Sequence, residues 1–232
     1  MSLSQHKSQI YKVDNFNDLL STKFKGDINA ICWNRNLKGD FSEIVNKITL
    51  EGNMSKILPQ QLLNLKLSEQ GQLARETLLN DFKVLKEHGK IPTLNIIKHY
   101  ERDDAFPFFP TDVYSYHVDR SPIPADTFLC TYHGASSDIL PNSQGIQKIL
   151  IPEIRAELKK LYGEEPDEGF ESFLSEFFFD LHYQAKPEAQ PINLGIGHLW
   201  KLAIDYPESE VLPCLHRAPK EKAGEPRLMM IC

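Results

Sequence analysis

The sequence predicts an α+β protein with a mainly helical first part and a strand-rich second part. Apolar residues recur at helical spacing before residue 91, and β-branched and aromatic runs separated by turn residues follow from residue 92. Helical spacing returns between about residues 151 and 183. We therefore expect a helical and strand support region over 1–91, and a sheet structure with a helical insertion over 92–232, together forming one integrated domain.

The first part contains one strand-like run and two segments with helical periodicity. Residues 28–33 form a short apolar run suited to a strand, while 40–48 place four apolar side chains on one helical stripe. Residues 68–88 have mostly helical spacing, with Ser68 as the N-terminal cap and Gly89 as the terminator. This pattern favours a helical layer packed on a sheet.

The second part contains six strand-like runs. They cover residues 93–98, 113–117, 127–132, 198–204, 211–216 and 227–231. Asp- and Pro-rich turns separate the first three runs, which is typical of successive antiparallel strands.

Residues 151–183 interrupt these strands with two helical patterns. The first ends at Gly163, and the second follows Asp167 as its cap and carries a stripe of Phe residues. Such stripes usually pack in a core. The alternative is a lid over a substrate opening, which would favour an apolar or aromatic substrate.

Composition limits the classes of function. Of the 232 residues, 41% are hydrophobic and 10% aromatic, which indicates a folded globule. The formal charge of −6 argues against general nucleic-acid binding. No segment reaches the roughly 20 apolar residues of a membrane span, and Met1–Lys7 has no secretory signal character. We expect a soluble, cytoplasmic protein that acts on a small-molecule or peptide substrate.

The four cysteines are widely separated and form no Cys-x-x-Cys pair. They are Cys32, Cys130, Cys214 and Cys232. This spacing favours buried, reduced thiols over a zinc site or a disulfide framework.

The chemically informative residues are His117 and Asp119, which are separated by one residue, followed by His216 and Arg227. Two imidazoles and one carboxylate are the ligand set with which non-haem Fe(II) oxygenases hold iron and leave coordination positions open. In an extended chain, His117 and Asp119 point to the same side. The guanidinium of Arg227 suits a carboxylate, either of a ligand or of a structural Asp or Glu.

The order His-x-Asp, a long spacer, His, and Arg about ten residues later resembles the Fe(II)/2-oxoglutarate-dependent dioxygenases over residues 93–231. The segments 116–119, 128–132, 215–219 and 226–229 also look like a bacterial family of unknown function associated with that superfamily, and Ile31–Arg35 looks like that family's early segment. The resemblance implies a double-stranded β-helix, the jelly roll or cupin-like barrel, with N-terminal helices and a helical insertion between its two halves.

The resemblance also implies roles for individual residues. His117, Asp119 and His216 would bind Fe(II), and Arg227 would hold the distal carboxylate of the cosubstrate 2-oxoglutarate. Tyr132 and Thr131 are candidates for hydroxyl donors to that carboxylate, although a Tyr at a strand end often serves packing. The implied reaction is hydroxylation of a substrate coupled to decarboxylation of 2-oxoglutarate.

Two other functions fit the same residues. One is a cupin-like isomerase or hydrolase that uses the three ligands for another divalent ion and needs no 2-oxoglutarate. The other is a non-catalytic binding module. Among the remaining histidines, His133 follows a predicted strand and is expected in a loop, with replacement of a ligand as the alternative. His182 and His198 are expected to belong to the helix and the strand that contain them.

Overall fold

The computed structural model describes residues 9–163, 167–220, 222 and 224–232. The segment Met1–Lys7, from which we expect no secretory signal, lies outside the described residues, as does 164–166 in the predicted insertion. None of the helices in the described part combines the length and the apolar character that crossing a bilayer requires.

The first part of the chain contains three strands and four helices. In order they are β1 (Ile10–Val13), α1 (Phe16–Ser21), β2 (Ala30–Trp33), α2 (Phe41–Lys47), β3 (Met54–Ile57), α3 (Pro59–Leu63) and α4 (Glu69–Glu87). The rest contains β4 (Thr93–Ile97), β5 (Tyr116–His117), β6 (Asp126–His133), β7 (Asp138–Leu140), β8 (Gly145–Gln147), α5 (Pro152–Tyr162), α6 (Glu168–Glu176), β9 (His182–Ala185), β10 (Ile192–Asn193), β11 (Leu199–Ala203), β12 (Leu215–Arg217) and β13 (Arg227–Ile231).

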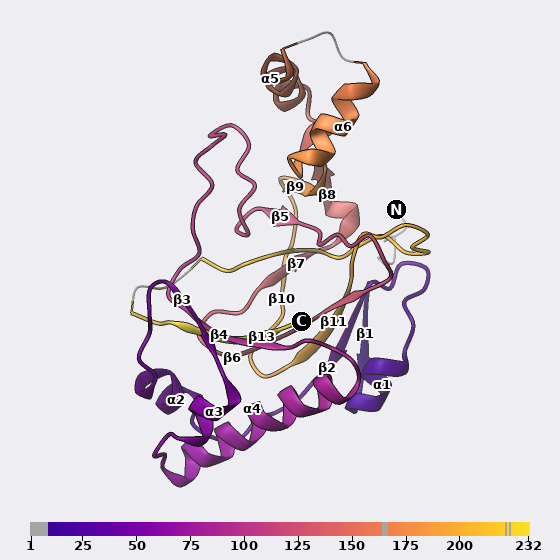
Figure 1. The fold of residues 1–232 in the computed structure, drawn as a ribbon. Helices are drawn as coiled ribbons and strands as arrows, with labels where there is room; N and C mark the ends of the chain where they lie inside the picture. The colour runs from indigo at the N-terminus through magenta and orange to yellow at the C-terminus, as the bar shows by residue number, and fades with distance from the viewer. Residues whose placement is uncertain (1–8, 164–166, 221, 223) are drawn as a thin grey trace.

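These strands form two sheets, so the predicted α+β class is confirmed. The large sheet has the order β1-β2-β11-β6-β13-β4-β3, and the small sheet has the order β10-β7-β12-β5-β9-β8. Strand pairing is antiparallel except between β1 and β2. In Figure 1 the helices α1–α4 lie below the large sheet, and the small sheet lies above it.

The helical layer is built from the predicted periodicity. Ser68 caps α4 by accepting a hydrogen bond from the backbone N–H of Gly71, and Gly89 after the helix has a φ of 75°. Leu78 and Leu85 of α4 are fully buried against the large sheet. Because β1, β2 and β3 all belong to this sheet, the support region and the second part of the chain share one core.

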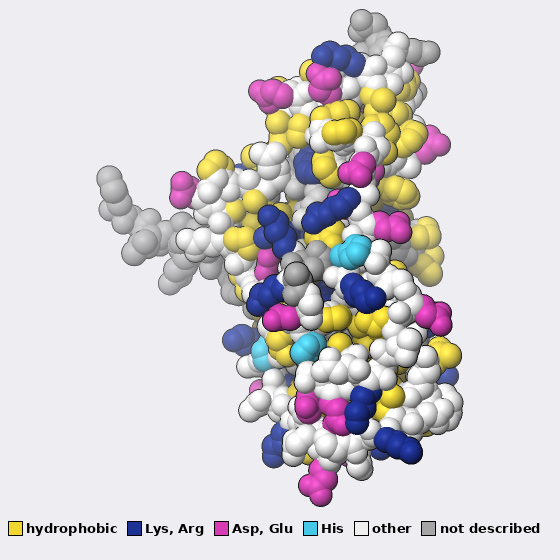
Figure 2. Space-filling view, turned by 90° about the vertical axis from the view of Figure 1, so that its left-hand side faces the viewer, with side chains coloured by type: hydrophobic (Ala, Val, Ile, Leu, Met, Phe, Trp, Pro, Cys, Tyr) yellow, Lys and Arg dark blue, Asp and Glu magenta, His cyan; other side chains and the backbone are white. Residues whose placement is uncertain are grey.

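The insertion lies between β8 and β9 and projects beyond the small sheet (Figure 1). It has its own apolar cluster, in which Phe170 and Leu174 of α6 pack with Phe109 and Phe179. Most of the Phe stripe therefore serves packing. Other apolar side chains remain on the surface here, including Phe178, and Figure 2 shows hydrophobic groups over this upper part of the molecule.

Three predicted elements are shorter in the structure than in the prediction. The run 113–117 is a strand only from Tyr116, because the Asp112 carboxylate accepts from the backbone N–H of Tyr114 in a turn. The run 211–216 is extended in a strand only from Leu215. The second insertion helix ends at Glu176, and Phe178 then adopts a φ of 59°, which no α-helix accommodates.

Candidate metal centre

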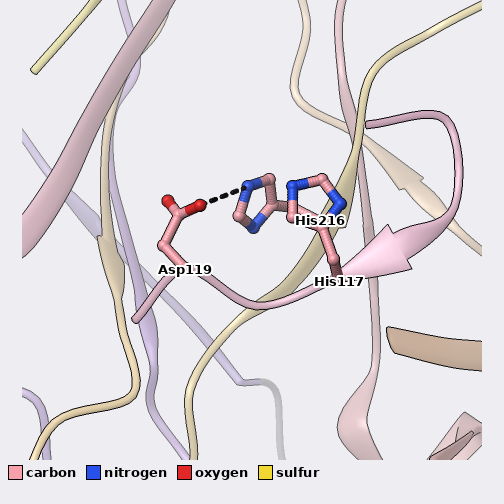
Figure 3. Close-up of side chains that lie close together, drawn as sticks. All are labelled: His117, Asp119 and His216. Atoms are coloured by element: carbon pink, nitrogen blue, oxygen red, sulfur yellow. Dashed lines mark ion pairs between the residues drawn. The ribbon is translucent and has the colours of Figure 1, made fainter. Parts of the chain in front are cut away.

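Two neighbouring strands of the small sheet bring His117 and His216 together. The two residues are directly opposed in the β5–β12 pair, and their ring centroids lie 4.5 Å apart. Asp119 follows two residues after His117 and turns back toward the rings, as Figure 3 shows. One ligand atom from each of the three residues lies within 4.8 Å of the others. This cluster could hold a metal ion.

Backbone carbonyl groups fix the orientation of both imidazoles. Nδ1 of His117 lies 2.8 Å from the carbonyl oxygen of Ser115, and Nδ1 of His216 lies 3.2 Å from that of Cys214. Since a carbonyl oxygen only accepts hydrogen bonds, each Nδ1 carries the proton. The Nε2 lone pair of each ring is then available to a metal ion.

One oxygen of the Asp119 carboxylate accepts a hydrogen bond, and the other oxygen faces the imidazole rings. Thr127 donates its hydroxyl to Oδ2 over 2.5 Å, while Oδ1 lies 3.7 Å from Nε2 of His216. The backbone carbonyl of Asp119 accepts from the N–H of Asp205 at 2.8 Å, which fixes the chain beyond β5. Oδ1 is thus the oxygen positioned to bind a cation.

The protonation states of the cluster suit a divalent cation. Burial, followed by the nearby His216, lowers the pKa of His117 to about 4, so its ring is neutral at neutral pH. Burial acts to raise the pKa of Asp119, but His216 and the Thr127 hydroxyl outweigh it and hold this pKa below its ordinary value. A neutral imidazole and an ionised carboxylate are the forms that bind metals.

Arg227 lies between the two sheets among hydroxyl groups. Its side chain is buried, and Nη2 donates to the hydroxyls of Thr131 and Ser137, each at 2.8 Å, while Nη1 donates to Tyr100 at 3.3 Å. The backbone at Gly134 passes close to that at Arg227: a Cβ on Gly134 would lie 2.9 Å from the Arg227 Cα. The structure thus brings Arg227 and Thr131 into contact.

Ser137 and Tyr100 were not predicted as part of this cluster. Ser137 precedes the three-residue strand β7 in the run Ser136-Ser137-Asp138, and no motif distinguishes it in the sequence. Its position follows from the pairing of β7 with β12, which sets Ile139 opposite His216. Ser137 lies two residues before Ile139, at the start of the strand next to the one that carries a candidate ligand, directly before its first residue.

The structure places Tyr132 away from Arg227. Its hydroxyl donates to Oδ2 of Asp81 in α4 at 2.7 Å, and Oδ1 of the same carboxylate pairs with Arg35 at 2.8 Å. Thr131 and Tyr132 are neighbours on β6, and successive strand residues face opposite sides of a sheet. Tyr132 therefore belongs to the interface between the large sheet and the helices, in contrast to the expectation that it contacts a cosubstrate.

Two other histidines have positions that differ from those expected. His182 begins strand β9 instead of ending a helix, and it lies directly opposite His117 with ring centroids 5.8 Å apart. His133 ends β6 and lies outside the cluster of described residues that could hold a metal ion.

Comparison of the chain with models of known protein families, with functionally characterised proteins and with solved structures yields no match. The chemistry of the His117, Asp119 and His216 side chains and of the Arg227 cluster therefore carries the functional assignment.

Proposed function

We propose that the protein is a non-haem Fe(II)- and 2-oxoglutarate-dependent oxygenase that hydroxylates a substrate. The observation that carries this proposal is the convergence of His117, Asp119 and His216, whose ligand atoms lie within 4.8 Å of one another. Two imidazoles and one carboxylate fit Fe(II) and occupy only part of its coordination sphere. Bound iron and 2-oxoglutarate would supply the oxidation of a substrate C–H bond by O₂.

The strand order supports a double-stranded β-helix. Eight strands form two interleaved sets, β11-β6-β13-β4 in the large sheet and β10-β7-β12-β5 in the small one. Along the chain, β4 to β7 alternate between the sheets, and β10 to β13 do the same. Two sheets of four antiparallel strands with this alternation are the arrangement of a jelly roll. In this description β1–β3 extend one sheet, and β8 and β9 with the insertion extend the other.

The surroundings of Arg227 fit a carboxylate. The oxygens of Thr131 and Ser137 accept from the guanidinium, so their hydroxyl protons are available to a bound anion. A planar guanidinium flanked by hydroxyl groups matches both the charge and the oxygens of a carboxylate. Since Ser137 directly precedes β7, which pairs with the strand that carries His216, a 2-oxoglutarate molecule held by Arg227 would extend toward the metal ligands.

Anaerobic visible absorption tests the cosubstrate site. Addition of Fe(II) and then 2-oxoglutarate to the wild-type protein should produce a metal-to-ligand charge-transfer band. Arg227→Gln should weaken this band, because the distal carboxylate loses its cation. Arg155→Gln is the matched control, since Arg155 pairs with Glu171 between the insertion helices.

Iron content tests the ligands. The double variant His117→Ala/His216→Ala should lose stoichiometric iron, whereas His99→Ala, which changes an exposed histidine, should retain it. Full retention of iron by the double variant contradicts the proposal. Iron binding without the charge-transfer band favours the cupin-like isomerase or hydrolase, and absence of metal binding in the wild type favours a binding module.

A further inference from the structure

A row of basic side chains continues beyond the candidate metal centre across the small sheet. His117 is opposed by His216 on β12 and by His182 on β9. Lys148 directly follows β8, whose ladder with β9 ends at the pair Gln147–Tyr183, and it begins a short 3-10 helix near His182. Opposed residues of adjacent antiparallel strands project from the same face of a sheet. The three histidines therefore share one face, and Lys148 lies next to His182 at the end of this row.

His182 has an unsatisfied polar atom at this position. The residue is only 4% exposed, and its Nδ1 is buried without a hydrogen-bond partner in the part of the chain that the structure describes. A buried imidazole nitrogen without a partner is unfavourable. A group from a ligand would satisfy it.

Lys148 adds a cation beside this ring. Its Nζ donates to the carbonyl of Pro110 at 3.1 Å and lies 4.9 Å from the centroid of Phe109, and the His182 ring packs against the same Phe109 at 6.2 Å. Lys148 forms no ion pair with any described residue. A half-buried ammonium group without a counter-ion is costly. The site thus lacks an anion.

The nearest acidic side chains are engaged elsewhere. Asp112 accepts from the backbone N–H of Tyr114 and lies 4.0 Å from Arg102. Asp103 accepts from both the backbone N–H and the hydroxyl of Thr111. Each carboxylate exerts some attraction on the row, but neither is paired with Lys148.

We propose that Lys148 and His182 form a subsite for an oxyanion, a carboxylate or a phosphate, carried by the substrate. The substrate would then be a small anionic molecule whose reacting carbon faces His117, Asp119 and His216. Adjacent strands lie about 4.8 Å apart, so β8, which Lys148 directly follows, and β5, which carries His117, are separated by about 10 Å. This reach fits a small metabolite. The assignment of a substrate rests on the proposed oxygenase function, whereas anion binding itself can be measured without it.

Calorimetric titration of the metal-free full-length chain tests the subsite. The probes are inorganic phosphate, pentanoate and the neutral amide pentanamide, which separate a phosphate site from a carboxylate site and both from apolar binding. We expect saturable binding of at least one anion and none of pentanamide. In the wild type, side-chain ¹⁵N NMR should show the Nδ1 resonance of His182 shifting as the anion is added.

Variants identify the groups that bind the anion. Lys148→Met should weaken binding about tenfold or more, and His182→Phe, which keeps a ring against Phe109, about threefold to tenfold. Lys159→Met on α5 is the matched control and should bind as the wild type does. Binding should also persist in Arg227→Gln, because the subsite is separate from the proposed cosubstrate site.

Specific outcomes overturn the inference. The inference is wrong if the wild type shows no saturable anion binding, or if it binds pentanamide as tightly as the anions. It is also wrong if Lys148→Met binds the anion with the affinity of the wild type. Loss of anion binding in Arg227→Gln, with retention in Lys148→Met, would likewise overturn it. Loss of the iron and 2-oxoglutarate absorption band in a folded Lys148→Met variant would also overturn it, because Lys148 would then serve the cosubstrate. Anion binding without any such band in the wild type refutes the oxygenase proposal and leaves the subsite intact.

Discussion

His117 and His216 are directly opposed on β5 and β12, and each ring is held by the backbone carbonyl two residues before it in the sequence. The same local contact is therefore made twice, once from each strand of an antiparallel pair. Because a carbonyl fixes each Nδ1 as the donor, the two Nε2 atoms are free on the same face. The backbone alone thus preorganises two of the three candidate ligands, and side-chain support is needed mainly by Asp119.

The hydroxyl of Thr127 should influence metal affinity through Asp119. Thr127→Val preserves shape but removes the donor that holds Oδ2, so the carboxylate gains freedom. We expect Fe(II) affinity to fall by about 10- to 100-fold, the range for loss of a group that orients a ligand. Competition with a chromophoric chelator measures this affinity.

A matched control is available for that substitution. Thr111 donates its hydroxyl to Asp103 at the same 2.5 Å distance as in the Thr127–Asp119 pair, but outside the candidate metal cluster. Thr111→Val should leave Fe(II) affinity unchanged. Equal affinities in Thr127→Val and the wild type would show that Asp119 is not a ligand or needs no such support.

The elements that the sequence predicts well are those long enough to show a period. Helix α4 covers 19 residues and carries its own cap, and β6 covers eight residues of β-branched and aromatic character. Strands β5 and β10 have only two residues each. No periodicity exists over two residues, so pairing with neighbouring strands determines these elements.

In the candidate site, too, some residues can be predicted from the sequence and others are placed only by strand pairing. His117 and Asp119 are close enough in sequence for the prediction to place them together, and the order of His216 and Arg227 after them is the basis of the resemblance from which their roles are proposed. Ser137, His182 and Lys148 are distant in sequence from these residues, and the pairing of β7, β8 and β9 within the small sheet brings them near. Register depends on tertiary pairing, which local sequence does not specify.

Thr131 and Tyr132 should respond oppositely to removal of their hydroxyls. Thr131→Val deletes a partner of Arg227 and should weaken 2-oxoglutarate binding about threefold to tenfold with little effect on unfolding. Tyr132→Phe leaves the buried carboxylate of Asp81 without one donor and should lower the free energy of unfolding by about 1–2 kcal/mol, with 2-oxoglutarate binding unchanged. Urea denaturation and the charge-transfer band report the two properties. A weaker band in Tyr132→Phe would restore Tyr132 to the cosubstrate site.

Lys148 should destabilise the ligand-free protein below pH 8. Burial lowers its pKa from the ordinary 10.5 to about 8, so between these values the unfolded chain binds more protons than the folded one. Stability therefore rises with pH across this window, and the full cost of the buried charge is present below it. Lys148→Met should be more stable than the wild type at pH 7 by about 1–2 kcal/mol, after allowance for partial exposure and the lost bond to Pro110.

This advantage of Lys148→Met should shrink as the pH approaches 10.5. Urea denaturation at pH 7 and at pH 10 measures it, and Lys159→Met controls for removal of an exposed lysine. Two results would show that the Pro110 and Phe109 contacts outweigh the burial of the charge. One is a Lys148→Met protein less stable than the wild type at pH 7, and the other is a stability difference between the two proteins that is the same at pH 7 and pH 10.

Arg120 should couple the helical insertion to the candidate metal centre. It follows Asp119 directly, and its guanidinium pairs with Asp205 at 2.7 Å and Asp180 at 2.6 Å and donates to the hydroxyl of Ser175 at the end of α6. Asp205 in turn donates its backbone N–H to Asp119. One side chain thus connects the insertion with both segments that hold the carboxylate ligand.

Arg120→Gln should therefore release the insertion without unfolding the protein. Partly exposed ion pairs contribute little, so we expect unfolding to become easier by only about 0.5–1 kcal/mol. Hydrogen exchange over residues 168–181 should become faster, and Fe(II) affinity should fall less than in Thr127→Val, because the Thr127 bond remains. Arg155→Gln breaks a contact between α5 and α6 and should leave Fe(II) affinity unchanged. If exchange over 168–181 does not change in Arg120→Gln, the apolar cluster around Phe179 holds the insertion without help from Arg120.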